Sequence, residues 1–567
     1  MAKRLKTAEK AASKPTKPTS PDHLTMRLFA PGMSLLHRAG LGGLACTLKA
    51  MERQYENGLL AEAKLPAPFD DGTPPWEITD DSVTLRFGKP ERAEKYLKKL
   101  FAFAFDIGKK DGLIRLPGQF NGEASTAVLA DLQQGLTLTF LQHGKVRLLA
   151  KEPTTVSYDP EGDGVLGVEV TYRKCSGFKH QEGWKEFVDS TGCLSSKRIR
   201  LDGPICPGTV VRHVAFTSDS AAEDPPDRML PLYFALVGCL PLSVNRGVAA
   251  LLVPEVENLS EFIWDRPAMT PTTAKEAQIA NAADAALQSQ WRLRRNPTRT
   301  AHVRKKIKEL TSGAICGVYA MTFTPTAWAS QQKSRIATIH VPKADDKLLD
   351  RFERALTHLP LRIVPRKVKE STGRGKNKSV VERTESFRAD SIVRPLIAEN
   401  LALGRAWYSG FIRLMTKTNP ATDKPYRNQL PFERKGLHAM ISDPTMWDAA
   451  GESIVVQAVH SALRGRYAQI ADENKTNPVA MRNRFGGEYD RWRLAFAGSK
   501  TADQFRKALC DLFSRAGRNE VLQQQWQQVL PMLRTANWQH ARDLALLALC
   551  SYQGRGVDSD SPQPESK

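Results

Sequence analysis

The chain has 567 residues, of which 41% are apolar and 25% charged, as in a soluble globular protein with room for three or four domains of about 150 residues. Its 38 glycines and 35 prolines exclude a collagen-like or low-complexity chain, and eight cysteines exclude a disulfide scaffold. With 82 Lys and Arg against 61 Asp and Glu, the net charge is +21, which favours a polyanionic partner, above all nucleic acid.

The N-terminal 25 residues carry lysines and prolines but no apolar segment of a secretory signal. They predict a disordered basic arm over 1–25. The longest apolar run, 229–242, is interrupted by two prolines and is too short to span a bilayer. We therefore expect a cytoplasmic protein with no membrane partner.

Strand and helix patterns are mixed between the arm and residue 390. Strands are expected over 83–87, 145–150, 165–172, 209–216, 315–323 and 335–341, and helices over 91–105 and 273–293. Because strands and helices do not alternate regularly, the expected fold class is α+β with an antiparallel-rich sheet. We predict one nucleic-acid-binding domain over 26–390.

Helix signals replace strand signals after residue 390. Asp443 followed by Pro444 predicts a helix start, and apolar residues with a period of 3.6 follow. Thr501 with Gln504 forms a capping box, and Gly517 predicts the end of that helix. Further helices are expected over 519–530 and 537–552. The sequence thus predicts an all-helical bundle over 391–555 and a disordered tail over 556–567.

Catalytic motifs are missing from the sequence. It contains no G-x-x-x-x-G-K-[ST], H-E-x-x-H or paired C-x-x-C motif, so we predict no catalytic residue, no metal ligand and no cofactor. One alternative stays open, a metal-dependent nucleic-acid-processing enzyme that uses the Cys/His region 175–213. Its candidate ligands are Cys175, His180, Cys193, Cys206 and His213. Their irregular spacing also suits scattered core residues. A regulator that binds only protein is a third hypothesis.

A glycine-rich segment, Gly40, Gly42 and Gly43, follows His37 and Arg38. It matches G-x-G-x-x-A, but the preceding residues look helical rather than strand-like, so dinucleotide binding is not favoured. Two interpretations remain: a tight turn between two helices, or a backbone that a phosphate can approach. We include all five residues as candidate nucleic-acid contacts.

Two basic clusters carry the strongest functional signal. Residues 292–308 contain eight basic and no acidic side chains, and 362–383 contain eight basic against two acidic. Such density is unfavourable unless an anion neutralises it, although a solvated surface is the simpler alternative. Residues 373–378 predict a flexible basic loop between extended segments, and a polar run, 331–335, precedes a strand. The candidate contacts are Arg292, Arg294, Arg295, Arg304, Lys305, Lys306, Lys333, Arg335, Arg374, Lys376 and Lys378.

Aromatic and basic residues interleave at 405–413 and at 482–493. Such rings could stack on exposed bases, or they could be core residues of helices. Both interpretations stay open.

Three segments resemble a known family, the large subunit of type I CRISPR effector complexes in its myxococcal, DevT-like branch. They are MRLFAPGMSLLHRAGLGGLA (26–45), WASQQKSR (328–335) and RPLIAENLALGRAWYSGF (394–411). The helical C-terminus is similar too, so the resemblance spans most of 26–555.

The resemblance implies a non-catalytic role beside guide RNA. Such subunits inspect the motif that flanks the target in double-stranded DNA and help to open the duplex. The C-terminal helices would correspond to the small subunit. Implied partners are guide RNA, target DNA, the repeated backbone subunit and the guide 5′-end subunit of Cascade, with helicase-nuclease or transposition machinery as further candidates. Guide pairing would supply most of the sequence discrimination.

Overall fold

The computed structural model describes residues 21–69, 72–142, 146–159, 168–207, 223–244, 247–295, 315–328, 331–372, 379–419 and 423–554. The predicted arm over 1–25 lies almost wholly outside these residues, and the predicted tail over 556–567 lies wholly outside them. The expected strand 209–216 also falls outside the described part of the chain.

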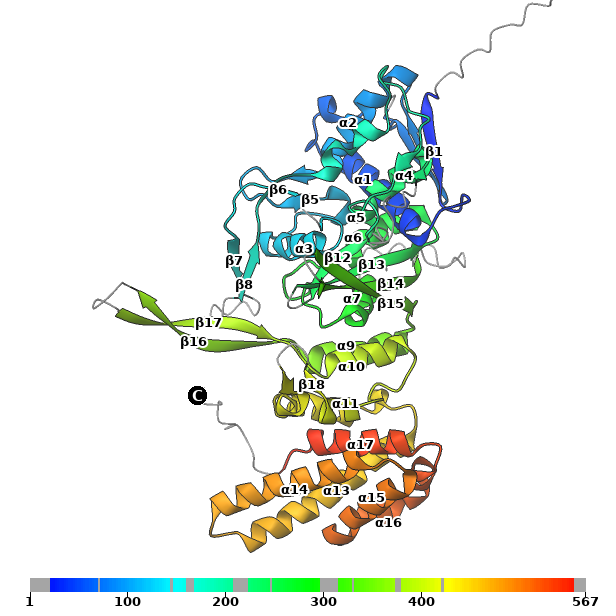
Figure 1. The fold of residues 1–567 in the computed structure, drawn as a ribbon. Helices are drawn as coiled ribbons and strands as arrows, with labels where there is room; N and C mark the ends of the chain where they lie inside the picture. Colours follow the sequence, from blue (N-terminus) through cyan, green and yellow to red (C-terminus); the bar gives the residue numbers. More distant parts are fainter. Residues whose placement is uncertain are drawn as a thin grey trace, which may run out of the picture.

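The first region packs three helices among short antiparallel sheets (Figure 1). Its elements are β1 (His23–Arg27), α1 (Leu35–Glu56), β2 (Trp76–Ile78), β3 (Ser82–Arg86), α2 (Ala93–Ala104), β4 (Asp106–Ile107), β5 (Ile114–Arg115), α3 (Thr126–Leu138), β6 (Val146–Leu148), β7 (Thr154–Tyr158), β8 (Val168–Tyr172), β9 (Cys175–Phe178), β10 (Ile199–Arg200) and β11 (Glu223–Asp224).

The second region contains the largest sheet, antiparallel in the order β12-β13-β14-β15. Its elements are α4 (Pro226–Tyr233), α5 (Ala235–Gly238), β12 (Leu240–Val244), β13 (Val248–Val256), α6 (Leu259–Met269), α7 (Ala282–Arg295), β14 (Ile315–Trp328), β15 (Gln331–Pro342), α9 (Asp346–His358), β16 (Arg362–Thr372) and β17 (Ser379–Ala389). The antiparallel sheets confirm the expected α+β class.

The third region is built from stacked helices, with one small ribbon, β18–β19, that the sequence did not predict. Its elements are α10 (Arg394–Ala402), α11 (Ile412–Thr416), β18 (Thr418–Asn419), β19 (Lys424–Pro425), α12 (Arg434–Ser442), α13 (Ala450–Glu473), α14 (Pro478–Gly498), α15 (Ala502–Ala516), α16 (Glu520–Val529) and α17 (Trp538–Ser551). The described chain is all-helical from residue 434 to 551, as predicted. The exact domain boundaries stay predictions.

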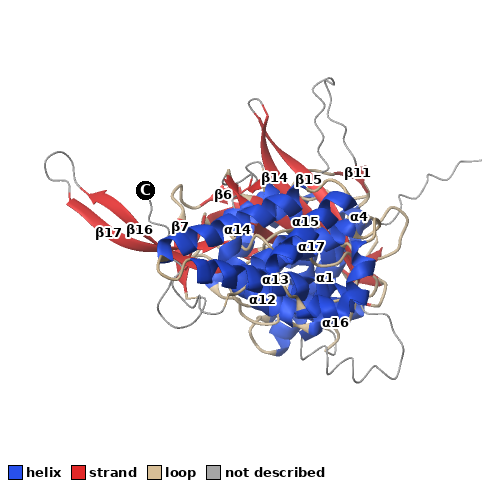
Figure 2. Cartoon of the chain, turned by 90° about the horizontal axis from the view of Figure 1, so that it is seen from below, coloured by secondary structure: helices blue, strands red, loops and turns tan. Residues whose placement is uncertain are grey.

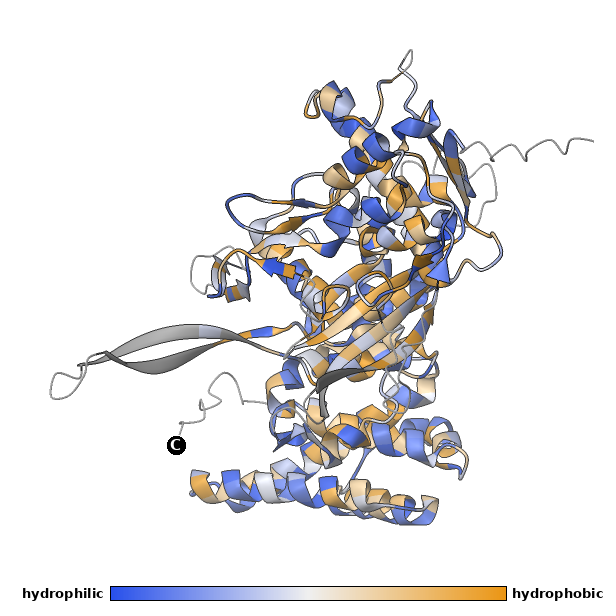
Figure 3. Cartoon of the chain, turned by 45° about the horizontal axis from the view of Figure 1, so that its top comes forward, coloured by the Kyte–Doolittle hydropathy of each residue, from blue (hydrophilic) through white to orange (hydrophobic). Residues whose placement is uncertain are grey.

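One hydrophobic core runs through all three regions. Its buried members extend from Leu24 to Cys550 and include the apolar run 229–242, now α4, α5 and part of β12. The apolar residues of the central sheet appear in orange in Figure 3. α17 is buried along Leu544–Cys550, which places it at the centre of the bundle, between α12, α13 and α14. No helix in the described ranges is long and apolar enough to cross a membrane.

The glycine-rich segment lies inside α1, not in a turn. Gly40, Gly42 and Gly43 are buried against other helices. A Cβ at Gly40 would lie 2.0 Å from the carbonyl oxygen of Pro231. A Cβ at Gly43 would lie 2.3 Å from the carbonyl oxygen of Phe234. These glycines therefore let α4 and α5 approach α1 closely, which corrects both the turn and the phosphate interpretations.

Two helix starts illustrate how far local signals reach. Thr501 caps α15 through the backbone N–H of Gln504, and Gly517 ends that helix with φ +81°, as predicted. Asp443 also acts as a cap, but it begins only a short 3₁₀ turn, Pro444–Met446, and α13 starts at residue 450.

We expect Gly43→Ala to destabilise the protein, because the added methyl group meets backbone atoms of α5 that cannot move aside. Overpacking of this kind costs about 1–3 kcal/mol, so thermal unfolding should shift to lower temperature. Gly486→Ala is the matched control: it lies in α14 with nothing within 4 Å of the new methyl group. That variant should unfold at an equal or higher temperature, since alanine is favoured over glycine in helices. Equal melting of both variants would contradict the close-approach role.

Candidate nucleic-acid interface

The second basic cluster forms a long antiparallel ribbon. β16 and β17 pair from Arg362↔Ala389 to Thr372↔Ser379, and the described chain adds no third strand to them. Figures 1 and 2 show the ribbon projecting away from the body of the molecule. At about 3.4 Å per residue, its eleven paired positions span roughly 37 Å.

The charge of this ribbon is strongly positive. Between residues 362 and 389 there are nine basic and three acidic side chains. Arg374, Lys376 and Lys378 lie in 373–378, outside the described residues, in the segment that joins the far ends of the two strands. The sequence prediction of a basic loop between two extended segments therefore coincides with the connection of a projecting ribbon.

Lys333 and Arg335 lie on a second ribbon. β14 and β15 belong to the central sheet up to Phe323, the last residue of β14 that pairs with β13. Beyond it, the β14–β15 pairing continues from Thr324↔Arg335 to Trp328↔Gln331. Figure 2 shows this extension leaving the sheet in a direction different from that of β16–β17.

Arg294 and Arg295 lie at the end of α7 and face acidic residues of α9. Arg294 lies 2.7 Å from an Asp350 carboxylate oxygen and 3.1 Å from one of Glu353. Arg295 also pairs with Glu353 at 3.1 Å, and its guanidinium lies 4.9 Å from the ring centre of Trp291. Acidic residues more than 50 positions away thus neutralise this end of the cluster. Arg304, Lys305 and Lys306 fall within 296–314, outside the described residues.

Arg292 is buried and serves the fold, which corrects its assignment as a phosphate contact. It is 7% exposed and donates hydrogen bonds to the carbonyl oxygens of Met269 and Glu276 at 3.0 and 3.2 Å. Burial lowers the pKa of its guanidinium to about 10. A side chain held in this way cannot reach a nucleic acid.

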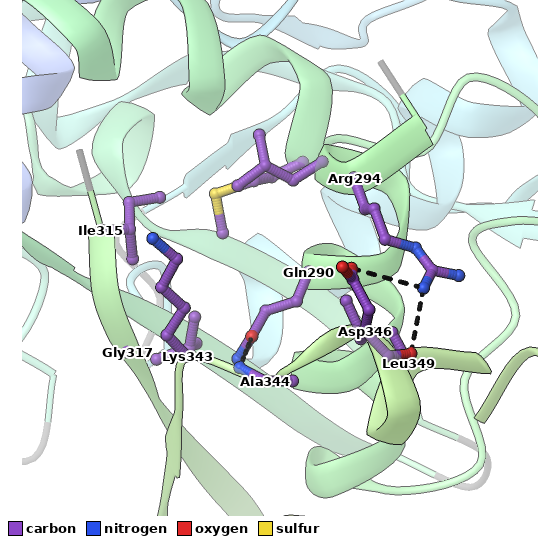
Figure 4. Close-up of a pocket in the computed structure, with 11 residues that line it drawn as sticks. Gln290, Arg294, Ile315, Gly317, Lys343, Ala344, Asp346 and Leu349 are labelled. Carbon is purple, nitrogen blue, oxygen red and sulfur yellow. Dashed lines mark hydrogen bonds and ion pairs between the residues drawn. The ribbon is translucent and has the colours of Figure 1, made fainter. Parts of the chain in front are cut away.

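A small cavity lies beside Arg294 (Figure 4). Its volume is about 140 Å³, and its lining includes the apolar side chains of Met269, Leu293, Ile315 and Leu349. Ligand pockets typically measure about 300–1,000 Å³, so this cavity is too small for a nucleotide.

His37 and Arg38 also have partners within the fold. His37 lies 2.7 Å from the hydroxyl of Ser34 and 3.2 Å from a carboxylate oxygen of Asp224. Burial lowers its imidazole pKa. The Arg38 guanidinium lies 5.7 Å from the ring centre of Phe29. Since the neighbouring glycines are buried, the structure does not bring these five residues together as a phosphate site.

Within its described residues, the Cys/His region shows no ligand cluster. Among the described residues, no group of three His, Cys, Asp or Glu side chains could hold a metal ion, and His213 lies outside them. Cys175 is buried, and burial raises its thiol pKa to about 11. His180 is fully buried among the rings of Phe105, Phe178 and Tyr233, with ring centres 5.6–5.8 Å apart.

The interleaved aromatic segments are mostly core. Trp407, Tyr408, Phe411 and Trp492 are at most 1% exposed, so these rings cannot stack on bases.

A comparison with known proteins identifies the family. The DevT N-terminal domain model matches residues 25–233, and the DevT C-terminal domain model matches residues 443–566. The CRISPR-associated protein Cas8a1/Csx13 of Myxococcus xanthus (strain DK1622) is 34% identical over 563 residues, covering 97% of this chain and 92% of that protein. The chain belongs to the Cas8a1/Csx13 family. This confirms the resemblance to type I CRISPR large subunits seen in the sequence.

The fold of this Cas8a1/Csx13 family member also gathers a basic cluster that sequence reasoning missed. Lys174 follows β8, and its ammonium lies 3.5 Å from the carbonyl oxygen of Lys110 in the β4–β5 turn. The Lys174 carbonyl oxygen accepts a hydrogen bond from Leu149 N–H at 2.8 Å, which brings 147–151 alongside. Members of this β4–β9 cluster, all at least partly exposed, are Lys109, Lys110, Arg147, Lys151, Arg173 and Lys174. They come from three separate segments, so no local run of charge reveals them.

Acid should destabilise the protein through His180. Burial lowers its imidazole pKa from 6.5 to about 3 in the folded protein. Below about pH 6.5 the unfolded chain therefore binds a proton that the folded chain does not, and stability falls by about 1.4 kcal/mol for each pH unit. We expect His180→Phe, which suits the aromatic surroundings, to flatten the dependence of melting temperature on pH between about 6.5 and 4. His23→Phe, at an exposed histidine, is the control. An unchanged acid dependence in His180→Phe would contradict this assignment.

Proposed function

We propose that the chain is the non-catalytic large subunit of a type I CRISPR surveillance complex, which contacts guide RNA and target DNA, reads the motif flanking the target and aids opening of the duplex. Family membership supports the large-subunit role. The proposed contact with nucleic acid is supported by one observation, the projecting basic ribbon β16–β17.

A ribbon of this kind has the size and charge for double-stranded DNA. The major groove of B-DNA admits a two-stranded antiparallel ribbon, and basic side chains along it neutralise phosphates on both sides. In the proposed function the connection at 373–378 enters or follows a groove, with Arg374, Lys376 and Lys378 as its cations.

Two further surfaces extend the proposed interface. Lys333 and Arg335 lie on the β14–β15 extension. The β4–β9 cluster lies on the same side of the molecule as β16–β17, and β8 contacts β17 (Figure 1). Cations on three separate surfaces suit a nucleic acid that is held by its sugar-phosphate backbone. Base contacts by the protein are then less important, because base pairing with the guide supplies sequence discrimination.

The proposed partners are guide RNA, target double-stranded DNA, and the backbone and guide 5′-end subunits of the complex, in the cytoplasm. The proposal includes no catalytic residue, metal or cofactor. Cleavage or another downstream reaction would then be performed by other proteins.

Charge reversal at the ribbon connection tests the proposal. We expect replacement of Arg374, Lys376 and Lys378 by Glu to weaken binding of target duplex by the assembled complex by roughly tenfold or more at moderate salt. The slope of log affinity against log salt concentration should become shallower by about 3, one unit for each lost phosphate contact. Assembly of the complex should not change.

The matched control reverses three exposed cations away from the ribbon, Lys89, Arg92 and Lys95, around the start of α2 near the top of Figure 1. This variant has the same net charge as the first, so it corrects for the general loss of positive field. Equal binding and equal salt slopes in the two variants would remove the ribbon from the interface.

A further inference from the structure

The direction in which the β16–β17 ribbon points is fixed at its base. In the described structure β8 contacts β17, and neither strand of the ribbon pairs with a strand of another sheet. With a length of roughly 37 Å, a rotation of about 10° at the base would displace the far end by about 6 Å. The contacts at the base therefore decide where the basic connection lies.

The chain that follows the ribbon is held by a buried carboxylate. Glu433, the last residue of a 3₁₀ turn (Leu430–Glu433), is 5% exposed. It accepts hydrogen bonds from the Ser391 hydroxyl and the Ile392 N–H, both at 2.8 Å, and from the Val393 N–H at 3.3 Å. These residues lie directly between the end of β17 and the start of α10.

The first residue of the ribbon contacts Phe432, the residue that precedes Glu433. The guanidinium of Arg362, the first residue of β16, lies 4.7 Å from the ring centre of Phe432. Arg362 pairs with Ala389, the last residue of β17, so this contact acts on both strands at once. The Arg362 charge also favours ionised Glu433, opposing the burial that raises the pKa of that carboxyl.

The chain that precedes the ribbon packs on the same short segment. At Gly436, in the first turn of α12, an added Cβ would lie 2.0 Å from the carbonyl oxygen of His358, the last residue of α9. α12 in turn packs against α17, where His438 Nδ1 lies 3.2 Å from the carbonyl oxygen of Ser551. Residues 432–436 thus contact the chain before, at and after the base of the ribbon, and they continue into the helical bundle.

We propose that residues 432–436 form a positioning clasp, which sets the direction of the β16–β17 ribbon and couples it to the C-terminal helical bundle. The proposal rests on the proposed function only for what the ribbon binds. Phe432 and Glu433 are positioning residues: they contact the base of the ribbon, not its basic connection.

The test is a distance measurement in the full chain without nucleic acid. Cys510 on α15 is the one cysteine of the eight that is exposed, so it accepts a spin label in the bundle. Thr384→Cys places the second label on β17, with the partly exposed Cys206 and Cys316 replaced by serine. Pulsed electron paramagnetic resonance then reports the distribution of distances between ribbon and bundle.

We expect Phe432→Ala with Glu433→Gln to broaden or shift this distribution, because the amide cannot accept all three hydrogen bonds and the ring contact with Arg362 is lost. Leu530→Ala with Glu520→Gln is the matched control, at an exposed leucine and an exposed glutamate near α16. The control should match the parent protein. A distribution unchanged by the clasp variant would overturn the proposal.

Phe432→Ala alone covers the case in which the double variant does not fold, since Phe432 is 49% exposed and its loss leaves the core intact. A broadened distribution is again expected, and an unchanged one overturns the clasp.

Duplex affinity separates the two proposals. A clasp variant retains all the cations, so it should bind target duplex a few-fold more weakly with an unchanged salt slope. If the ribbon charge reversal does not affect duplex binding, the proposed function is wrong, but the distance result for the clasp is unaffected.

Discussion

Two buried carboxylates hold the chain segment 391–394, which connects the sheet region to the helical bundle. Arg394, the first residue of α10, lies 3.0 Å from Asp284 of α7, and their side chains are 4% and 0% exposed. Glu433 binds the three residues just before Arg394. Removing one member of a buried ion pair leaves an uncompensated charge and costs about 3–5 kcal/mol. This constraint fixes the point at which the ribbon ends and the helices begin.

Much of the fold could be predicted because many elements carry local signals. The N-cap at Thr501 and the glycine at 517 depend only on neighbours within one turn, and the structure confirms both. The reciprocal half of the predicted capping box differs, because the Gln504 side chain accepts a hydrogen bond from the Lys500 N–H instead of the Thr501 N–H. The role of Gly40 could not be predicted in this way, because it is decided by a backbone carbonyl almost 200 residues away in α4. Local patterns cannot show which helix approaches a glycine, so a packing contact resembled a phosphate loop.

The candidate site shows the same division. The sequence shows where cations accumulate, and at 362–389 the backbone forms a ribbon that projects from the body of the molecule. At 292–295 the same signal has a different outcome, because Asp350 and Glu353 of α9 neutralise the guanidinium groups. Conversely, Lys110 and Lys174 meet only after the β4–β5 turn and β8 have folded. Charge density in a sequence therefore does not by itself predict a nucleic-acid contact, because acidic side chains distant in the sequence can neutralise the cations.

Among the described strands, none pairs with the outer edges of β16 and β17. Each such edge presents backbone groups to which the strand of another molecule could hydrogen-bond. Dense like charge keeps such edges apart in solution, because two ribbons that approach each other bring their lysines and arginines together. The screening length falls from about 10 Å at 0.1 M salt to about 3 Å at 1 M salt, so the repulsion between two ribbons is then largely screened. Molar salt would thus favour edge-to-edge self-association of the β16–β17 ribbon, which stays monomeric at moderate ionic strength.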